Sequence, residues 1–460
     1  MYYNNYYQQD NLVKKLSDLR IKNNNLYQIQ DDKEKKTRKF FTQDGNITIA
    51  SYNPYDNYNQ YSGNIPSQNR LLPYYNNSSS SYENNYNEKK LYKKKLEEEY
   101  NKYNLNNQSM HINKEYDLRE LNDIISSKIG LKNLGNTCYM NTCLQILIHS
   151  KEFIKRILSK KSYINEKTTP ITKQFLNLCE KMIYSKERID PSEFKNIIKE
   201  KHSIIKGQFD TQEFCRILLE DINNELNEKR YKTNVYEELS TEGKNKIDCD
   251  AEFDELFRKR ESSIIIDTFY SQIINIIKCK RKKKEENYSF EKILDLPLLF
   301  PEEDNDIIWL KDLINNYFLE EELIFSKNSK CKYCGKRTHI KQIKISRPPD
   351  ILILSLQRIN YRTQKKNKCK VEFKETLNLQ NYIDEDCGHN NEYIYDLYAI
   401  GCHAGDINFG HYFAYIKLND QDWYEFNDSK VNYIGDNYYT KSTLSYVYVL
   451  FYKKNHKINY

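Results

Sequence analysis

A cysteine lies where a glycine-containing turn gives way to a helical pattern, and this segment constrains the chain more than any other. Residues 130–142 read GLKNLGNTCYMNT, and apolar residues then recur at helical spacing as far as Leu147. Thr137 is a good helix N-cap, so we expect Cys138 in the first helical position. The unpaired amide groups and the dipole of a helix start favour negative charge, and a stabilised thiolate is a nucleophile. A buried, inert cysteine is the alternative interpretation of the same residues.

The first 127 residues differ from the rest of the chain in composition. They are rich in Asn, Tyr, Gln and Ser, and their aliphatic residues are too sparse for a packed core. We expect residues 1–127 to be a low-complexity, disordered segment, with one charged stretch at 88–103 that could form a transient helix. Apolar segments recur from about Ile124 onward, and we expect residues 128–455 to be folded, which leaves room for one large enzyme domain.

Cysteine usage and charge limit the partners and the compartment. All 11 cysteines lie in the second part, without the spacing of a disulfide framework, and the chain opens on a polar segment. From this we expect reduced thiols in the cytosol or nucleus. No apolar run is long enough to cross a bilayer, so we expect no membrane partner. The net charge of +7 is a mild surplus, and nucleic acid is not an expected partner. The basic run 278–284 predicts a solvated hairpin tip, with a localisation signal or an acidic partner as alternatives.

Helical patterns come first along the folded part and strand patterns follow. Amphipathic spacing predicts helices at 151–159, 172–184, 191–199 and, after a capping sequence that begins at Asp210, as far as Leu226. Period-two or short apolar runs predict strands at 264–266, 271–278, 340–345, 351–357, 393–402, 411–418, 423–427 and 445–452. This order predicts an α+β enzyme in which a cleft between the two layers places Cys138 opposite the strands.

A cysteine nucleophile needs a base, and the base needs a group that orients it. His411 is the best placed of the eight histidines, because it follows the glycine-containing loop 401–410 and starts a strand. His403, inside that loop, is the alternative, and a purely structural histidine is possible for both. If the strands from His411 and Trp423 pair as a hairpin, Asn427 or Asp428 can accept the imidazole N–H and fix its tautomer.

Four blocks of the sequence together resemble the ubiquitin-specific proteases. Residues 130–141 resemble the cysteine box of that family, and residues 395–428 resemble its histidine box. Between them, residues 208–214 resemble the family's Gln/Asp/Glu-Phe segment and residues 347–358 its central strand. The blocks occur in the family's order and span about residues 129–454. Phe209 beside Gln208 departs from the pattern, since the family often has a second polar residue there.

The resemblance implies a papain-like core with a helical thumb, a sheet-rich palm and β fingers. The implied activity is thiol-dependent hydrolysis of the isopeptide or peptide bond after the C-terminal glycine of ubiquitin, through a thioester. The implied partners are ubiquitin and ubiquitinated proteins. By matching position, the nucleophile, the base, the third triad member, a supporting or substitute carboxylate and the oxyanion donor are Cys138, His411, Asn427, Asp428 and Asn133.

The resemblance also suggests how the ubiquitin tail is recognised. That tail is basic and ends in two glycines, so carboxylates should line its approach to a narrow channel. Asp210 and Glu213 match family positions suited to this role, although a helix-capping role alone is the alternative. Tyr412 would form a wall of the glycine channel, or would face the core instead.

The fingers depart from the family pattern. Many members hold zinc there with two Cys-x-x-Cys pairs; here Cys331 and Cys334 form one pair, but Cys279 is followed three places later by Lys282. A fourth ligand could come from His339, Cys249 or Cys369, yet closed structural sites need four well-placed ligands. We therefore expect metal-free fingers and no cofactor, with zinc at Cys279, Cys331 and Cys334 as the alternative.

Two other functions are compatible with the same fold. One is a catalytically inert ubiquitin-binding scaffold, and the other is a protease for another ubiquitin-like modifier. The joint presence of Cys138, His411 and Asn427 favours an active enzyme over a scaffold.

Overall fold

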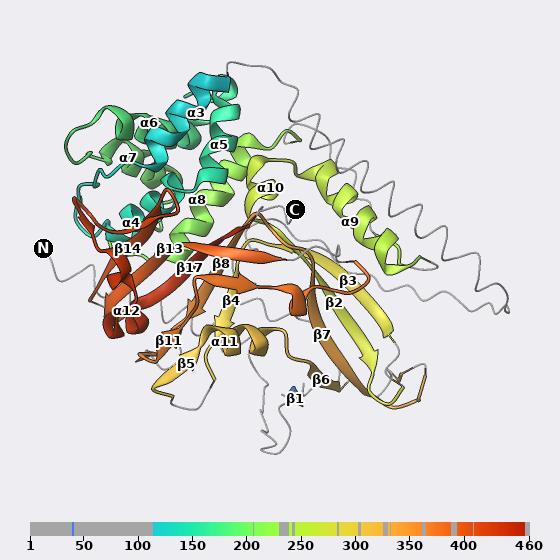
Figure 1. Ribbon diagram of the computed structural model, residues 1–460. Coiled ribbons are helices and arrows are strands. Elements are labelled where there is room, and N and C mark those ends of the chain that lie inside the picture. Colours follow the sequence, from blue (N-terminus) through green and yellow to red (C-terminus); the bar gives the residue numbers. More distant parts are fainter. Residues whose placement is uncertain are drawn as a thin grey trace, which may run out of the picture. The chain divides into compact units, whose positions relative to one another are not determined.

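The computed structural model describes residues 39–40, 114–205, 207–229, 239–241, 244–282, 285–301, 305–324, 330–331, 333–360, 365–387, 393–407 and 409–455. The expected helix at 88–103 lies outside these residues. In the described part, a helical region precedes a sheet region, as Figure 1 shows, so the α+β class is confirmed. No described helix combines the length and the apolar character needed to cross a membrane.

The helical region is built mainly from elements that come early in the chain. The α-helices are α3 (Lys114–Ile125), α4 (Cys138–Ile148), α5 (Lys151–Ser159), α6 (Pro170–Tyr184), α7 (Ser192–Lys201), α8 (Thr211–Leu226), α9 (Lys246–Arg260), α10 (Ile264–Phe269), α11 (Leu310–Tyr317) and α12 (Lys441–Tyr446). Short 3-10 turns are η2 (Lys161–Tyr163), η3 (Gln380–Tyr382) and η4 (Gly435–Tyr438).

Most of the strands follow α10. They are β1 (Lys39–Phe40), β2 (Ser271–Cys279), β3 (Glu285–Ile293), β4 (Leu296–Leu299), β5 (Ile307–Trp309), β6 (Glu321–Ile324), β7 (Thr338–Arg347), β8 (Ile351–Gln357), β9 (Ile359–Asn360), β10 (Lys365–Lys366), β11 (Lys370–Glu372), β12 (Thr376–Asn378), β13 (Ile394–Gly405), β14 (Gly410–Leu418), β15 (Asp422–Asn427), β16 (Lys430–Tyr433) and β17 (Val447–Lys454). The strand expected at 351–357 is confirmed at both ends.

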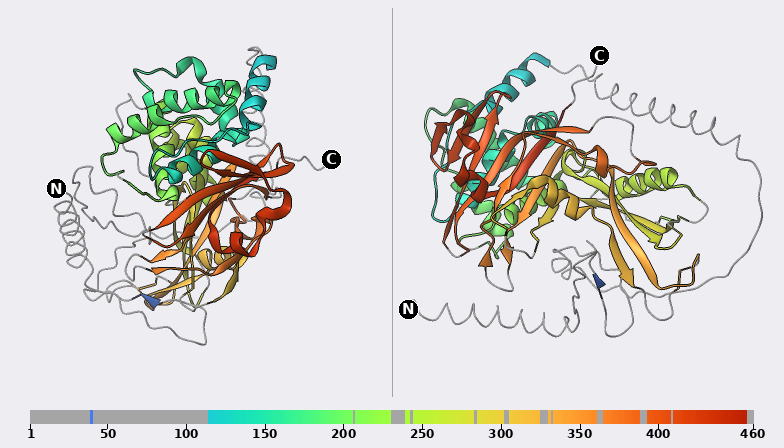
Figure 2. Two further views of the ribbon diagram at one scale, coloured as in Figure 1. Left: turned by 90° about the vertical axis from the view of Figure 1, so that its left-hand side faces the viewer. Right: turned by 60° about the horizontal axis from the view of Figure 1, so that its bottom comes forward.

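The larger sheet forms the palm. Its strand order is β16-β15-β14-β13-β17-β8-β4, with β12 also paired to β13. All of its pairs are antiparallel except β4 with β8. The hairpin expected between the His411 and Trp423 strands is confirmed, because β14 and β15 pair in antiparallel register. The right-hand view of Figure 2 shows this sheet together with the fingers.

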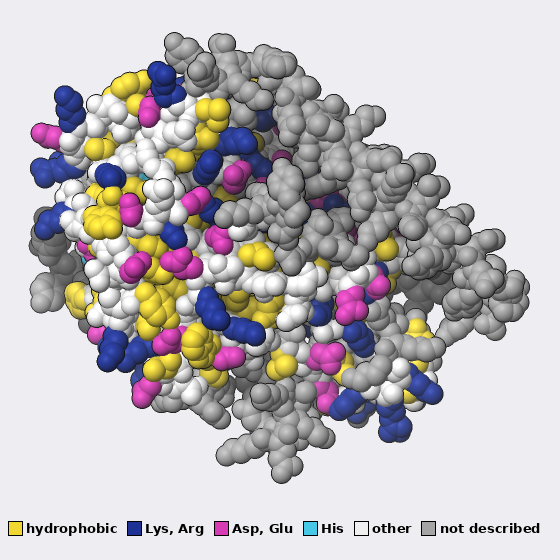
Figure 3. Space-filling model, in the orientation of Figure 1, with side chains coloured by type: hydrophobic (Ala, Val, Ile, Leu, Met, Phe, Trp, Pro, Cys, Tyr) yellow, Lys and Arg dark blue, Asp and Glu magenta, His cyan; other side chains and the backbone are white. Residues whose placement is uncertain are grey.

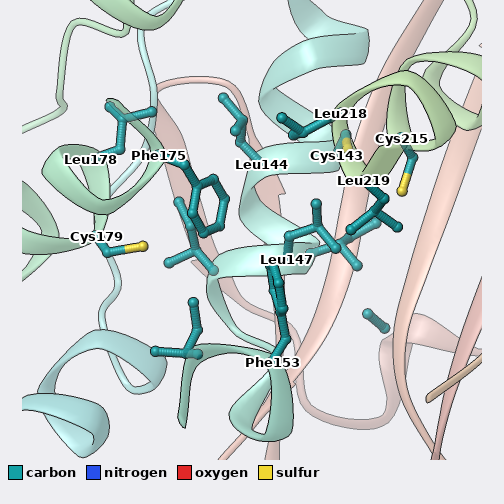
Figure 4. Close-up of a cluster of buried hydrophobic side chains, with 14 of the residues drawn as sticks. Cys143, Leu144, Leu147, Phe153, Phe175, Leu178, Cys179, Cys215, Leu218 and Leu219 are labelled. Carbon is teal, nitrogen blue, oxygen red and sulfur yellow. The ribbon is translucent and has the colours of Figure 1, made fainter. Parts of the chain in front are cut away.

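Helix α4 is the centre of the helical region. Every residue from Cys138 to Ile148 is buried, which is typical of a helix enclosed on all sides. One side contacts β13, β14 and β15, and another contacts α8. Figure 4 shows Leu144 and Leu147 of α4 among side chains of α6 and α8, including Phe175 and Leu218. This packing fixes the first turn of α4, and with it Cys138, against the palm sheet.

The second sheet forms the fingers, with strand order β1-β6-β7-β2-β3. Helix α9 is tied to this sheet by ion pairs: the Asp254 carboxylate accepts from Lys292 of β3 at 2.6 Å and from Arg347 of β7 at 3.2 Å. The turn between β2 and β3 begins at Lys280, so the hairpin tip expected for the basic run is confirmed for its described residues.

Two expectations are corrected by the structure. Residues 264–266 form the start of α10 and not a strand, because the Ser263 hydroxyl caps the helix by accepting from the amides of Ile265 and Ile266. The folded region also begins before residue 128. Helix α3 buries Leu121 and Ile124 in the core, although both lie within the segment expected to be disordered.

Candidate active site

The turn before α4 is organised by Asn133. Its side-chain oxygen accepts a hydrogen bond from the amide of Gly135 at 2.9 Å, which closes the turn. Thr137 stands at the N-cap of α4 as expected, and Cys138 is the first helical residue. The Thr137 hydroxyl does not cap the helix, however, because it accepts from the amide of Leu134 at 2.8 Å instead. The amides of the first helical turn therefore lack this side-chain cap.

The cysteine segment is held directly against the end of β15. A side chain on Gly130 would overlap the backbone of Ser429, with its Cβ only 2.5 Å from that carbonyl carbon, so only glycine fits. Next to it, the amide of Leu131 donates to the carbonyl of Asp428 at 2.8 Å. Two segments that are distant in the sequence are thus joined through their backbones, and this contact sets the position of Cys138 relative to β14 and β15.

His411 lies between Cys138 and Asn427. Its Nε2 is 2.7 Å from Asn427 Oδ1, and the imidazole also hydrogen bonds with the Cys138 sulfur. Because an amide oxygen only accepts, Nε2 carries the proton, which leaves Nδ1 for the sulfur. The side chain of His411 is 42% exposed, so the imidazole can exchange protons with solvent. The structure therefore brings together the three residues predicted to form the triad.

The surroundings of His411 favour its charged form. The hydrogen bond with Cys138 is the largest effect that raises the pKa of His411, to about 9. The hydrogen bond with Asn427 and the charges of Cys138 and Asp428 act in the same direction, whereas partial burial opposes them. The imidazolium is therefore the form of His411 that its surroundings stabilise.

Asp428 connects the cysteine segment to the histidine. One carboxylate oxygen accepts from the side-chain amide of Asn133 at 2.8 Å, and the other accepts from that of Asn141 at 2.7 Å. The Asp428 carboxylate lies 4.0 Å from His411 Nε2, farther than Asn427 does. Asn427 is therefore the direct partner of the imidazole, and Asp428 acts on it through charge. The side-chain N–H of Asn133, the predicted oxyanion donor, points to Asp428 here.

His403, the alternative base, is excluded by its surroundings. It lies in β13 and not in a loop, because β13 continues to Gly405 and only residues 406–409 separate it from β14. The residue is 2% exposed, and its ring stacks on Tyr412 at 4.3 Å between centroids. Burial, with the nearby charges of Lys366 and His411, lowers the pKa of His403 to about 3. The neutral, enclosed imidazole packs directly against Gly410, and a Cβ at that position would overlap the ring.

The predicted substrate-binding residues lie at the start of α8 and on β14. Asp210 caps α8 by accepting from the amides of Gln212 and Glu213, and it also accepts from the Tyr448 hydroxyl. Burial raises the pKa of Asp210, and these hydrogen bonds oppose that shift. Glu213 is half-buried on the first turn of α8. Tyr412 is 3% exposed and packs on His403, so its ring faces the core.

Three residues that support the site were not predicted from the sequence. The side chain of Gln208 donates to the Gly410 carbonyl at 2.7 Å, next to His411. Lys366 of β10 donates to the carbonyls of His403 and Gly405, both at 2.8 Å. Asn141 binds Asp428, as described above. Gln208 and Asn141 lie inside the sequence blocks that resemble the family, so those blocks pointed to them. Lys366 lies in a basic stretch outside the blocks.

The candidate metal ligands lie away from this site. The sulfurs of Cys279, Cys331 and Cys334 come together at the fingertip, and no fourth His, Cys, Asp or Glu ligand joins them among the residues that the structure describes. Cys249 and Cys369, suggested above as a fourth ligand, contact the Tyr288 hydroxyl and the Lys370 carbonyl instead.

The sequence pattern of the family described as ubiquitin carboxyl-terminal hydrolase matches residues 129–452. The chain belongs to this family. Ubiquitin carboxyl-terminal hydrolase 2 of Bos taurus is 31% identical over 70% of the chain and 54% of its own length. Ubiquitin carboxyl-terminal hydrolase 21 of Bos taurus is 27% identical over 71% of the chain and 62% of its own length. The chain thus spans between half and two thirds of these relatives.

Solved structures share the fold. The SAGA DUB module of Ubp8, Sgf11, Sus1 and Sgf73 bound to monoubiquitin gives a TM-score of 0.58 at 21% identity, over 73% of this chain and 71% of that one. The same module bound to ubiquitin aldehyde gives a TM-score of 0.56 at 22% identity, again over 73% and 71%. The resemblance to ubiquitin-specific proteases and their fold is confirmed.

Proposed function

We propose that the chain is a thiol-dependent deubiquitinase that hydrolyses the bond after the C-terminal glycine of ubiquitin. The observation that carries the proposal is His411, which contacts Cys138 on one side and the Asn427 side chain on the other. A nucleophile, a base and an orienting group in contact are the parts that acyl transfer through a thioester requires. Family membership and the ubiquitin-bound neighbours support ubiquitin as the substrate.

In the first half of the reaction, the Cys138 thiolate attacks the carbonyl carbon of the terminal glycine. The carbonyl oxygen becomes an oxyanion, and His411 then donates its Nδ1 proton to the departing lysine amine as the C–N bond breaks. A thioester between Cys138 and the ubiquitin carbonyl remains. Asn427 holds the imidazole in place throughout by accepting from Nε2.

In the second half, water replaces the amine. The now neutral His411 takes a proton from the water at Nδ1, and the resulting hydroxide attacks the thioester carbonyl. Collapse of the tetrahedral intermediate breaks the C–S bond, releases the ubiquitin carboxylate and restores the thiolate–imidazolium pair. Every step uses only side chains of this chain and water, so we propose that catalysis needs no cofactor.

The oxyanion would be stabilised by Asn133 and by amides at the start of α4. The Asn133 side chain donates to Asp428 in this structure, within the turn that carries Cys138. A rotation of the amide toward the sulfur, with Asp428 still holding Asn141, would present the donor to the developing charge. Such a donor is typically worth ~3 kcal/mol of transition-state stabilisation in other hydrolases.

We propose that Asp210 and Glu213 give the approach to Cys138 its negative charge, which matches the basic tail of ubiquitin. Asp210 combines this role with capping of α8, so the capping observed here is compatible with it. Tyr412 would act indirectly, by fixing Asp210 through a hydrogen bond. Its ring is buried, so it would not line the channel.

A ubiquitin derivative with a C-terminal propargylamide tests the proposal on the full chain under reducing conditions. The active enzyme forms one covalent adduct, and the Cys138→Ala variant forms none while it still binds ubiquitin. If the intact chain binds ubiquitin but forms no adduct, it is the inert scaffold. Fluorogenic fusions of ubiquitin and of its relatives, compared side by side, identify the modifier: faster turnover of a relative would replace ubiquitin as the substrate.

We propose a reducing compartment, the cytosol or the nucleus, as the place of action. None of the 11 cysteines, all of which the structure describes, forms a disulfide.

A further inference from the structure

The face of the palm sheet that carries His411 continues past the triad. Along β14, His411, Phe413 and Tyr415 alternate with residues that belong to the core around α4, so these three share the opposite face. Glu425 and Asn427 of β15 lie on the same face, because Glu425 is the direct partner of Tyr415 in the antiparallel register. Glu425 therefore stands two residues from the group that orients the base, about 7 Å along the strand.

The ubiquitin tail and the acceptor lysine extend from the scissile carbon in opposite directions. The proposed approach of the tail runs past the start of α8, where Asp210 and Glu213 lie. The departing amine takes its proton from His411, so the acceptor chain has to pass the imidazole. The His411 face beyond the triad is the surface that the acceptor meets next.

An aromatic floor lies beside Glu425. Phe413 packs edge-to-face with Tyr415 at 5.4 Å between ring centroids and with Tyr446 of α12 at 6.5 Å. Phe413 is buried, whereas both tyrosines are half-buried. Burial is the main cause that raises the pKa of Tyr415 to about 12, and the charge of Glu425 acts in the same direction, so the hydroxyl stays neutral. Half-exposed rings of this kind accept the aliphatic stem and the cationic head of a lysine or arginine side chain.

The Glu425 carboxylate pairs with no cation among the described residues. It is half-buried and accepts a hydrogen bond from the Asn432 side chain of β16 at 3.0 Å. Lys430, which faces Asn427 in the register, is exposed. Lys417, on the same face of β14, is already bound to Glu375 at 2.8 Å. A half-buried carboxylate without a counter-ion attracts a cation more strongly than a fully solvated one, because water and salt screen it less.

The fingertip carries charge of the opposite sign. Figure 3 shows Lys and Arg side chains gathered at the end of the finger strands. The exposed basic residues of the two turns there include Lys280, Arg281, Lys336 and Arg337. A basic acceptor segment is repelled by that surface, so a preference for basic acceptors has to arise elsewhere.

We infer that the His411 face of β14 and β15 is a subsite for the acceptor, in which Glu425 selects conjugates that carry a lysine or arginine within about two residues of the modified lysine. The basic head pairs with the Glu425 carboxylate while its aliphatic stem packs on Tyr415. The inference rests on the proposed function, since it names which ubiquitin conjugates that activity prefers. The neighbouring basic side chain is only held, and it takes no part in bond breaking.

Peptide conjugates of ubiquitin test the inference on the full chain under reducing conditions. Each conjugate joins the ubiquitin C-terminus to the lysine of a labelled peptide, and the peptides differ only in the two flanking residues, which are arginine, alanine or glutamate. Fluorescence polarisation follows release of the peptide and gives kcat/KM. The arginine peptide should be cleaved about 3- to 10-fold faster than the glutamate peptide at low salt, since an ion pair is compared with a repulsion. About 0.5 M salt should bring this ratio toward one.

Variants assign the preference to one carboxylate. Glu425→Gln removes the charge but keeps an oxygen for Asn432, and the arginine-to-glutamate ratio should fall to within about twofold. Glu425→Lys should reverse the ratio. Asp422→Asn is the matched control, because it removes one charge from the exposed start of the same strand, on the other face, and it should keep the parent ratio. A ratio of two rates for one protein cancels any common effect of a variant on folding or on the triad.

The outcomes separate this inference from the proposed function. If the parent forms no adduct with the propargylamide derivative and releases no peptide, the proposed function fails and the inference falls with it. A parent that cleaves the peptides equally, or the glutamate peptide fastest, is a deubiquitinase without this subsite. A preference that survives Glu425→Gln assigns selection to another residue, and a preference lost equally in Asp422→Asn assigns it to overall charge. Either result overturns the inference and leaves the deubiquitinase activity in place.

Discussion

The molecule holds sulfur in two contrasting settings. At the active site a single thiol, Cys138, contacts an imidazole whose pKa is raised to about 9. At the fingertip, the sulfurs of Cys279, Cys331 and Cys334 lie within 4.8 Å of one another, and the first two accept from backbone amides. No histidine belongs to the group in the described structure. A sulfur beside an oriented imidazole is placed for nucleophilic attack, whereas the fingertip sulfurs have no imidazole within their group. Chemistry here is set by the neighbours of the cysteine and not by the cysteine.

The sharpest way to break this contrast is to exchange one sulfur from each setting. Cys138→Ala should lower turnover of a fluorogenic peptide ending in Gly-Gly by at least ~10⁴-fold, because the attacking atom is removed. Cys331→Ser should leave turnover of the same peptide within about twofold, since a short peptide is cleaved far from the fingers. Steady-state kinetics on both variants measures this. Comparable losses in the two would show that the settings are not separate.

The second prediction concerns the base. His411→Gln should lower kcat by at least ~10³-fold, because the thiolate loses its proton partner. In the parent, kcat/KM should fall as the pH rises through about 9: a raised pKa keeps the imidazolium below that value, and the ion pair is lost above it.

Proton NMR of the Cys138→Ala variant supplies the matching control. Removal of the largest cause should bring the pKa of His411 down from about 9 toward its ordinary value. His403 should stay neutral between pH 5 and 8, because burial lowers its pKa to about 3. A His411 titration unchanged by the loss of the thiol would contradict the pairing.

How much of this could be predicted from the sequence depends on the range of the contact. Strand 351–357 and the helix from Thr211 to Leu226 were predicted to the residue, because local periodicity determines them. Residues 264–266 were predicted wrongly: three β-branched residues favour a strand, but the Ser263 cap and packing on α8 prevail. The bonds from Lys366 to the His403 and Gly405 carbonyls left no local signal, since they join separate segments.

The next largest fall in kcat is expected when the oxyanion donor is removed. Asn133→Ala should lower kcat about 10²–10³-fold with little change in KM, because the donor acts on charge that develops only in the transition state. Because Asn133→Ala also removes the oxygen that accepts from the Gly135 amide, circular dichroism and the melting temperature check that the domain stays folded. A loss confined to KM would make Asn133 a binding residue and not a catalytic one.

A smaller and more specific effect is expected at Asp428. Asp428→Asn removes a negative charge 4.0 Å from His411, and that charge helps to raise the pKa of the imidazole. The alkaline limit of kcat/KM should therefore move to lower pH, and kcat should fall about tenfold as the bonds to Asn133 and Asn141 rearrange. Asn427→Ala serves as the comparison, since it removes the direct bond. If the pH limit does not move in Asp428→Asn, the carboxylate acts only by holding the turn.

The smallest effect on kcat is predicted for Lys366, which supports the site but takes no part in its chemistry. Lys366 clamps the end of β13 through the carbonyls of His403 and Gly405, just before the short loop that leads to His411. Lys366→Met removes both bonds and should lower kcat only a few-fold, because each bond contributes about 1 kcal/mol to local order and none to proton transfer. Lys366→Arg, which keeps a donor, should recover most of the loss, while the pH limit near 9 set by His411 should be the same in all three proteins. A shifted limit in Lys366→Met would mean that the clamp tunes the imidazole itself, and the active site would then extend one strand farther than the direct contacts of Cys138.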